Sequence, residues 1–310
     1  MKRLLPLLLL IGGAQLDAQA SPPPFIVQES GAGFTTLQAA VDSIGSGSGT
    51  VLIGSGTHRD CAVQTEGRIS FLARMPGRAI FDGGICEGKA ALVLRGGGAR
   101  VSGLVFQNLR VPDGNGAGIR LEKGSLTVSD TLFRDSENGI LSGDDETGAI
   151  SIERSTFSGL GRCDRDLACA HSIYIGGYAL LKVTRSRFER GRGGHYAKSR
   201  AKRVEILDSS FDDTSGKATN YMIDLSNGAS GLIAGNVFVQ GADKENYSAL
   251  IMVGAEGARN SSAGLEVRDN DARIAPGVER RTSFLADASG DPIAIRANRL
   301  GAGISEFERR

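Results

Sequence analysis

The chain has 310 residues, of which 40% are hydrophobic, and a formal net charge of +1. This length suits one large domain or two ordinary ones, and a charge near zero indicates no class of partner. The 44 glycines and the lack of tryptophan, together with little helical periodicity, argue against a compact α/β enzyme. Alternating apolar residues among many glycines favour short strands joined by tight turns.

The first 20 residues have the features of a secretory signal peptide. A basic start, Met1-Lys2-Arg3, precedes the apolar run 4–11, and Ala18-Gln19-Ala20 offers a small-residue cleavage site. The apolar run is too short to span a bilayer. We therefore predict a signal peptide over 1–20 and a mature chain over 21–310. The mature chain is expected in the periplasm or the medium, with no membrane span.

Four cysteines in an exported chain favour two disulfide bonds, because such compartments are oxidising. Cys163 and Cys169 fall in one short loop, and Cys61 and Cys86 lie about one sequence repeat apart. The sequence therefore predicts the pairs Cys61–Cys86 and Cys163–Cys169.

The mature chain opens with a Pro- and Gly-rich stretch, 21–33, that is expected to be extended. Residues 34–44 place their apolar side chains at helical spacing, which predicts a helix. Thr35 or Thr36 suits its start and Gly45 its end. Residues 49–54 then form a strand pattern.

Beyond this point the chain is built from repeats. A short alternating strand ends in an apolar residue every 23 to 34 positions, at Phe106, Phe133, Phe157, Phe188, Phe211, Phe238, Ala272 and Leu300. A second strand follows in most repeats, starting at Gly118, Gly139, His171, His195, Tyr221 and Ser248. Coils of this kind expose an apolar face alone and bury it by stacking.

Other repeat architectures fit less well. A β-propeller blade needs about 40 or more residues, and a leucine-rich repeat needs a Leu/Asn ladder that this chain lacks. We therefore predict an all-β chain, a single-stranded right-handed parallel β-helix solenoid over 21–310. The short helix at 34–44 is expected to cap its N-terminal end.

Particular segments resemble known proteins. The helix segment LQAAVD followed by VLIGSGTHRD resembles the start of pectin-lyase-like β-helix proteins. The series HSIYIG, GHYAKSRA, YMIDLSNG and GAEG is similar to a bacterial family of right-handed β-helix repeat proteins. This resemblance covers nearly the whole mature chain and implies the fold. It implies no single activity, because the superfamily includes lyases, hydrolases, epimerases, esterases and non-enzymatic tailspikes.

In such a stack, equivalent positions of successive coils lie about 4.8 Å apart, and alternate side chains of a strand face opposite ways. Aligning the second strands by their apolar residues points one column outward: Tyr174, Lys198, Asp224 and Met252. Arg200 aligns with Ser226, and the strand starts align His171, His195 and Tyr221. Nearby turns and loops add Asn227, Glu245 and Glu256.

This set of residue types suits β-elimination from a uronate, which needs a base, an acid and a cation that stabilises the developing anion. Lys198 or His195 is the candidate base, Tyr174 or His195 the acid, and Arg200 the group that neutralises the carboxylate. The candidate substrate-binding residues are His171, Asp224, Asn227, Glu245 and Glu256. The pair Lys198-Ser199 resembles the lysine segment of β-helix alginate lyases and chondroitinase B, which implies Lys198 as base. The acidic calcium ligands that accompany that segment are not evident upstream.

Two alternatives to the lyase stay open. A glycoside hydrolase would use Asp224 with Glu245 or Glu256 as two facing acids. A non-catalytic glycan-binding protein would use the basic segment 182–203, which holds nine Lys or Arg residues and one acid. Lys198 and Asp224 would then be an ordinary surface ion pair.

We expect an acidic polysaccharide as partner, no nucleic acid, and a monomer. No metal or other cofactor is expected to be required, although the acidic loop Asp144-Asp145-Glu146 leaves calcium open.

Overall fold

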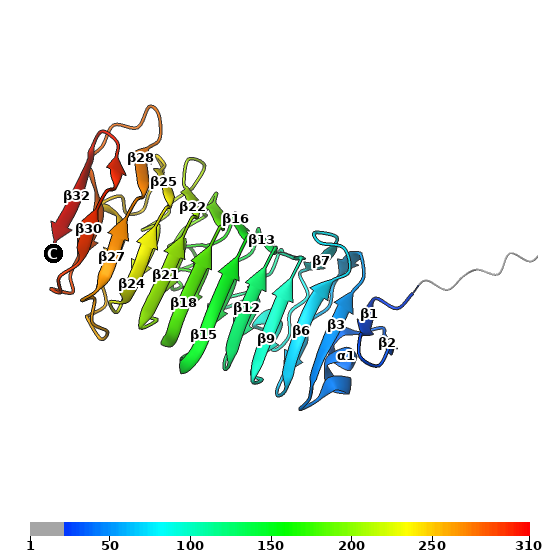
Figure 1. Ribbon diagram of the computed structural model, residues 1–310. Coiled ribbons are helices and arrows are strands. Elements are labelled where there is room, and N and C mark those ends of the chain that lie inside the picture. The colour runs from blue at the N-terminus through cyan, green and yellow to red at the C-terminus, as the bar shows by residue number, and fades with distance from the viewer. Residues whose placement is uncertain (1–21) are drawn as a thin grey trace, which may run out of the picture.

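The computed structural model describes residues 22–310, so the expected signal peptide lies outside the described residues. The chain winds into an elongated stack of coils, with β1 near one end and β32 at the other (Figure 1). From the second coil onward, each coil contributes one strand to each of three sheets, which we call sheets A, B and C. The repeats therefore form the parallel β-solenoid that the sequence predicts.

Sheet A has 12 strands, which are parallel except where β1 pairs with β2 and β3. In spatial order they are β2 (Gly33–Phe34), β1 (Phe25–Val27), β3 (Ser48–Ile53), β6 (Arg68–Ala73), β9 (Gly98–Ser102), β12 (Ser125–Ser129), β15 (Asp145–Glu153), β18 (Tyr178–Thr184), β21 (Arg203–Leu207), β24 (Ser230–Ala234), β27 (Leu265–Arg268) and β30 (Ala294–Arg296).

Sheets B and C each have 10 parallel strands. Sheet B contains β4 (Gly56–His58), β7 (Ala79–Asp82), β10 (Leu104–Gln107), β13 (Leu132–Arg134), β16 (Thr156–Ser158), β19 (Arg187–Glu189), β22 (Ser210–Asp212), β25 (Val237–Gln240), β28 (Asp271–Ile274) and β31 (Arg299–Leu300). Sheet C contains β5 (Ala62–Gln64), β8 (Ala90–Leu94), β11 (Ala117–Leu121), β14 (Asn138–Ser142), β17 (Ile173–Ile175), β20 (Ala197–Ser199), β23 (Ile223–Leu225), β26 (Ala249–Val253), β29 (Thr282–Asp287) and β32 (Ile304–Arg309).

The helix α1 (Leu37–Ile44) lies beside the first coils (Figure 1). The Thr36 hydroxyl accepts a hydrogen bond from the Ala39 amide and starts the helix, and Gly45, with a φ of 58°, ends it. Its apolar face, at Leu37, Ala40 and Val41, is buried in the core. The helical spacing therefore predicted this element within a few residues.

A column of phenylalanines forms the spine of the core. Successive rings from Phe81 to Phe238 stack with centroids 4.7 to 5.5 Å apart, which is close to the spacing of parallel strands. Each ring is fully buried, and burial of one such side chain is worth about 1.5–3 kcal/mol. The apolar residue at the end of each repeat is therefore a core residue, as predicted. His58 extends the column next to Phe81.

One corner of the solenoid is held by a ladder of polar side chains. In six successive coils a Ser or Asn side chain accepts the backbone N–H of the equivalent residue in the coil before it, the acceptors being Ser155, Ser186, Ser209, Asn236, Asn270 and Asn298. Such bonds satisfy backbone groups that a tight turn leaves unpaired. The strand-end asparagines of the last coils are thus structural.

Both predicted disulfides are present. Cys61 bonds to Cys86, and Cys163 bonds to Cys169 in the loop just before β17. The segment 182–203, by contrast, does not form one basic strip. Because its strands are divided among all three sheets, its cations face different sides. Eight of its nine cations pair with an acid, as Lys182 does with Glu205.

Candidate functional site

The outer face of sheet C carries the predicted column. The register pairs Tyr174 with Lys198, Lys198 with Asp224, and Asp224 with Met252. Their neighbours within each strand, such as Ile173 and Ile175, point into the core. The strand pleat therefore places the polar residues on one outer surface, as the repeat alignment predicts. We call Tyr174, His195, Lys198, Arg200, Asp224 and Glu256 the sheet C cluster.

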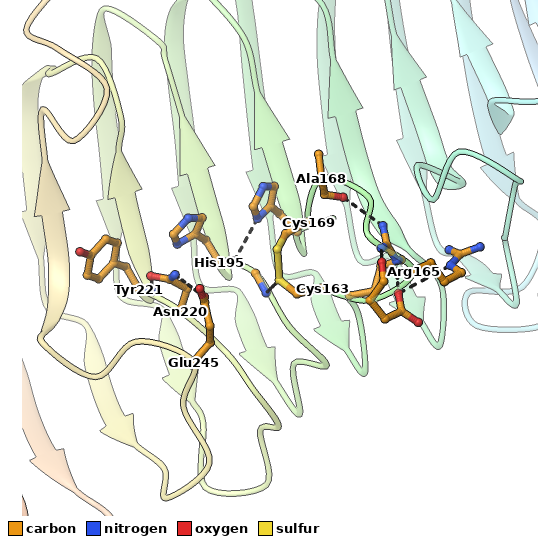
Figure 2. The surroundings of a disulfide bond; sticks show 12 residues. Cys163, Arg165, Ala168, Cys169, His195, Asn220, Tyr221 and Glu245 are labelled. Atoms are coloured by element: carbon orange, nitrogen blue, oxygen red, sulfur yellow. Dashed lines mark hydrogen bonds and ion pairs between the residues drawn. A yellow bond between two sulfur atoms is a disulfide. The ribbon is translucent and has the colours of Figure 1, made fainter.

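An aromatic stack runs along one edge of this cluster. The ring of His195 lies between His171 and Tyr221, with centroids 5.0 and 5.5 Å away. The Asn138 side chain accepts a hydrogen bond from the His171 backbone amide at 3.0 Å. Nδ1 of His171 accepts one from the His195 backbone amide at 3.0 Å, drawn as the dashed line beside His195 in Figure 2. Nδ1 of His171 is therefore unprotonated, and the proton of the neutral ring resides on Nε2. The alignment of these three rings was predicted from the strand starts.

His195 is a neutral imidazole next to a carboxyl group. Its Nε2 lies 3.5 Å from Oδ2 of Asp224, and its Nδ1 has no hydrogen-bond partner within residues 22–310. Burial, reinforced by the charges of Lys198 and Lys244, lowers the pKa of His195 to about 3. Burial likewise holds the pKa of His171 well below its usual value. Both rings are thus neutral at neutral pH.

Two carboxyl groups flank the ammonium group of Lys198. Its Nζ lies 3.4 Å from Oδ2 of Asp224 and 2.5 Å from Oε1 of Glu256. The guanidinium of Arg200 contacts the other Glu256 oxygen, through Nη2 and, at 3.2 Å, through Nε. One carboxylate is therefore bound by two cations, one on each oxygen. Such charge-assisted bonds are the strong class of hydrogen bond.

The two acids of the cluster differ in their ionisation. Burial raises the pKa of Asp224, and the nearby Lys198 and the 2.7 Å hydrogen bond from Ser226 only partly oppose it. Burial also works to raise the pKa of Glu256. The hydrogen bonds from Lys198 and Arg200 outweigh it and hold that pKa at about 2. Glu256 is therefore held ionised, whereas Asp224 is the acid whose pKa is raised above its usual value.

Tyr174 lies under both cations. The Arg200 guanidinium is 4.9 Å and the Lys198 ammonium 5.5 Å from the centre of its ring. The edge of His171 packs against the same ring, with centroids 5.3 Å apart. These cation–π and edge contacts hold the phenol in the cluster.

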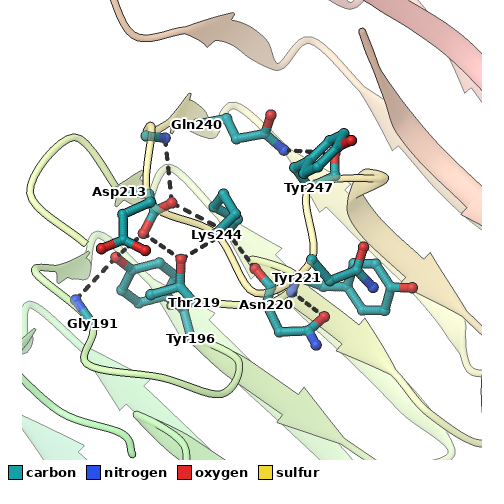
Figure 3. Close-up of polar contacts among 12 residues, drawn as sticks. Gly191, Tyr196, Asp213, Thr219, Asn220, Tyr221, Gln240, Lys244 and Tyr247 are labelled. Atoms are coloured by element: carbon teal, nitrogen blue, oxygen red, sulfur yellow. Dashed lines mark hydrogen bonds and ion pairs between the residues drawn. The ribbon is translucent and has the colours of Figure 1, made fainter. Parts of the chain in front are cut away.

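A buried polar network in the loops between sheets B and C adjoins the aromatic stack (Figure 3). Nζ of Lys244 lies 3.1 Å from Oδ2 of Asp213, and both side chains are almost completely buried. The Tyr196 hydroxyl donates to Asp213 at 2.7 Å, and Lys244 donates to the carbonyl of Asn220. Because Tyr196 and Asn220 adjoin two rings of the stack in the chain, the network fixes the backbone beside them.

The disulfide loop, with Cys163 and Cys169, lies beyond His195 on the side away from Tyr221 (Figure 2). Arg162 and Ala170 pair across the loop, immediately before His171. The Gly194 amide donates to Sγ of Cys163 at 3.2 Å, immediately before His195. The disulfide therefore fixes the chain at the start of two successive strands of sheet C.

Not every predicted site residue joins the cluster. The side-chain amide of Asn227 donates to the backbone carbonyl of Glu256 at 3.4 Å, so Asn227 holds the loop that carries Glu256. Glu245 instead binds the side chain of Asn220, at the margin of the stack. Sequence reasoning missed Asp213 and Lys244, because they lie in irregular loops where strand alternation gives no direction for a side chain.

No group of three His, Cys, Asp or Glu side chains is arranged to hold a metal ion in the described part of the chain. In the acidic loop, Asp144 accepts the Gly177 amide and Asp145 the Gly124 amide. Glu146 is 2.6 Å from Lys202. These oxygens therefore already have protein partners. No helix among residues 22–310 has the length and apolar character to cross a membrane.

The sequence matches no protein-family model and no curated protein. In structure, the chain is similar to rice weevil pectin methyl esterase, with a TM-score of 0.54 and 8% identity over 84% of this chain and 92% of that one. At this identity the likeness shows the parallel β-helix fold alone.

Two further solved structures have lower scores. Tailspike protein gp49 of Acinetobacter baumannii bacteriophage Fri1, a capsular polysaccharide depolymerase, has a TM-score of 0.44 and 10% identity over 87% of this chain and 60% of that one. Alginate lyase from Paenibacillus sp. str. FPU-7 has a TM-score of 0.45 and 14% identity over 88% of this chain and 94% of that one. The fold likeness to the weevil esterase agrees with the resemblance found in the sequence.

Proposed function

We propose that the protein is an exported polysaccharide lyase that cleaves a uronate-containing glycan by β-elimination. One observation carries the proposal. A neutral imidazole, a phenol and two cations meet on the outer face of sheet C. These are the groups that proton abstraction next to a carboxylate requires. Both cations, Lys198 and Arg200, are bound to the carboxylate of Glu256.

In the proposed reaction, neutral His195 removes the proton from the carbon next to the substrate carboxylate. Lys198 and Arg200 bind that carboxylate and stabilise the negative charge that develops on it. The bond to the leaving oxygen then breaks, a carbon–carbon double bond forms, and the hydroxyl of Tyr174 protonates the oxygen. The Asp224 carboxyl group, next to the ring, stabilises the positive charge of the protonated His195.

The structure favours His195 over Lys198 as the base. The amine hydrogens of Lys198 contact two carboxyl groups, which suits a cation that binds a carboxylate. His195 is neutral, and because its Nδ1, unpartnered in the described chain, is buried, Nε2 is the nitrogen proposed to accept the proton. His171 and Asn227 then act as positioning residues, through the His195 amide and the Glu256 carbonyl. Glu245 is proposed to contact the substrate at the margin of the stack, where it binds the Asn220 side chain.

The proposal includes export of the mature chain, 21–310. Both disulfides support it, because such bonds persist in oxidising compartments. The helix α1 is proposed to cap the first coil of a right-handed solenoid, since its apolar face is buried against that end.

A glycoside hydrolase is the second candidate, and one observation favours it. Asp224 and Glu256 both contact Lys198 Nζ, so their carboxyl groups are close together. Their pKa values are also shifted in opposite directions. A retaining hydrolase places its acid and its nucleophile about 5–5.5 Å apart, one protonated and one ionised.

One incubation separates these activities. The mature protein is mixed with a panel of uronate-containing and neutral polysaccharides, and ultraviolet absorbance and reducing ends are followed together. The lyase is expected to give new double bonds and reducing ends in equal amounts. Reducing ends alone would favour the hydrolase, and binding without either product would favour a glycan-binding protein.

A further inference from the structure

The carboxylate site formed by Lys198 and Arg200 is already filled. The carboxylate of Glu256 gives one oxygen to Lys198 at 2.5 Å and the other to Arg200. A planar carboxylate bound at both oxygens is the arrangement that a sugar carboxylate would adopt between the same cations. The Glu256 carboxylate thus lies where the carboxylate of a bound sugar would lie.

Hydrogen bonds hold the backbone of Glu256 in place independently of its side chain, so the side chain can leave Lys198 and Arg200 without movement of the backbone. The backbone amide of Glu256 donates to the Ser226 carbonyl at 2.8 Å, and the side chain of Asn227 donates to the backbone carbonyl of Glu256. Its side chain is 38% exposed, whereas that of Lys198 beneath it is 10% exposed. Rotation of the Glu256 side chain toward solvent would uncover both cations without moving the loop.

We infer that Glu256 is an internal competitor for the carboxylate of a uronate, which binds between Lys198 and Arg200 only when it displaces the Glu256 side chain. The inference rests on the proposed function, because it names the substrate group that this site takes. Departure of Glu256 leaves Asp224 beside Lys198, so Lys198 keeps an acidic partner in either state. Arg200 then loses the one ion pair that it forms among residues 22–310. Glu256 therefore lowers the affinity for acidic glycans and leaves the affinity for neutral glycans unchanged.

The expected effect follows from population arithmetic. The apparent Kd equals the intrinsic Kd divided by the fraction of molecules in which the site is free. If Glu256 fills the site in about nine molecules of ten, removing its charge tightens uronate binding about tenfold. Glu256→Gln is the suitable change, because the amide has the same shape but no longer competes as an anion.

A matched control exists on another face. Glu205 is also held by a lysine and an arginine, Lys182 and Arg203, each at 3.1 Å, but it lies on β21 in sheet A. Glu205→Gln makes the same change in net charge at a distance from the cluster. Any general effect of charge on an acidic glycan therefore appears in both variants.

Calorimetric titration with an oligouronate and with its methyl ester tests the inference. Glu256→Gln is expected to bind the oligouronate about tenfold tighter than the unmodified protein. The methyl ester should bind equally to both proteins, and Glu205→Gln should match the unmodified protein. Equal or weaker oligouronate binding by Glu256→Gln, or no carboxylate-dependent binding by either protein, would overturn the inference.

Product formation is measured separately, so the two proposals fail in different ways. Tighter binding by Glu256→Gln without unsaturated product would support the carboxylate site and contradict the lyase. Unsaturated product with unchanged oligouronate binding would support the lyase and contradict the competitor. Thermal unfolding of each variant shows whether it is folded before it is titrated.

Discussion

Nε2 of His195 lies 3.5 Å from Oδ2 of Asp224, and the same ring is stacked between His171 and Tyr221. The stacking fixes the plane of the imidazole, and the Asp224 carboxyl group lies close enough to stabilise a positive charge on the ring. This pair is the part of the sheet C cluster that the proposed chemistry requires most.

Replacing His195 by Asn is therefore expected to lower kcat for unsaturated product by about 10²- to 10⁴-fold, the range for loss of a general base. An asparagine is suitable because Asn138 already occupies the equivalent position of an earlier coil and accepts the next amide. Product absorbance under saturating substrate measures the effect, with thermal unfolding as the check on folding. Activity within a few-fold of the unmodified protein would rule out His195 as the base.

The two buried histidines predict a pH dependence of stability. In the unfolded chain a histidine has a pKa of about 6.5, whereas burial lowers the pKa of His171 and holds that of His195 at about 3. Below pH 6.5 the unfolded chain therefore binds protons that the folded chain does not, and the folded state loses stability as pH falls toward 3. His195 should remove about 2 kcal/mol between pH 7 and pH 5, and His171 should add to that loss.

Urea unfolding at pH 7 and pH 5 measures this loss. The double variant His171→Asn/His195→Asn should lose far less stability over the same interval. The raised pKa of Asp224 acts in the opposite direction, because the folded state then gains a proton as pH falls. An equal loss in the double variant would show that the histidines are not the source.

How far the sequence predicts this molecule depends on whether a residue lies in a repeat. The phenylalanine column and the alignment of Tyr174, Lys198 and Asp224 follow from a two-residue strand period applied coil after coil. Glu256 lies in an irregular loop where no period applies, so Glu245 seemed equally suitable from sequence alone. The structure brings Glu256 to the cations and leaves Glu245 beside Asn220.

The charge of a segment is a poor guide to the charge of a surface in this fold. Lys182 and Lys198 are close in the chain, but they lie on sheets A and C and contact different acids. A solenoid turns the chain to a new side at every strand, so composition within one coil is spread over three faces. Only the alignment of equivalent positions between coils recovers a surface.

Lys244→Met is expected to destabilise the protein by about 3–5 kcal/mol, because it leaves the buried Asp213 carboxylate without its cation. Lys202→Met is the control, since Lys202 forms an exposed pair with Glu146 and should change stability by less than about 1 kcal/mol. Urea unfolding compares the two. Similar small effects would mean that the network in Figure 3 contributes little to the fold.

Phe157→Ala is expected to destabilise the solenoid by about 3–5 kcal/mol, because the ring packs between Phe133 and Phe188 and no side chain can fill the space. Phe307 provides the matched change, because it is 38% exposed. Phe307→Ala should shift the thermal midpoint much less. Equal shifts would contradict the phenylalanine column as the main source of stability.

The composition of the products formed in ¹⁸O-labelled water tests the central claim most directly. β-Elimination adds no water, so the proposed lyase should release oligosaccharides that carry one double bond and no ¹⁸O. Mass spectrometry of early time points from the unmodified protein and from His195→Asn would show that product only with the former. Saturated products that carry one ¹⁸O would identify a hydrolase and contradict the account.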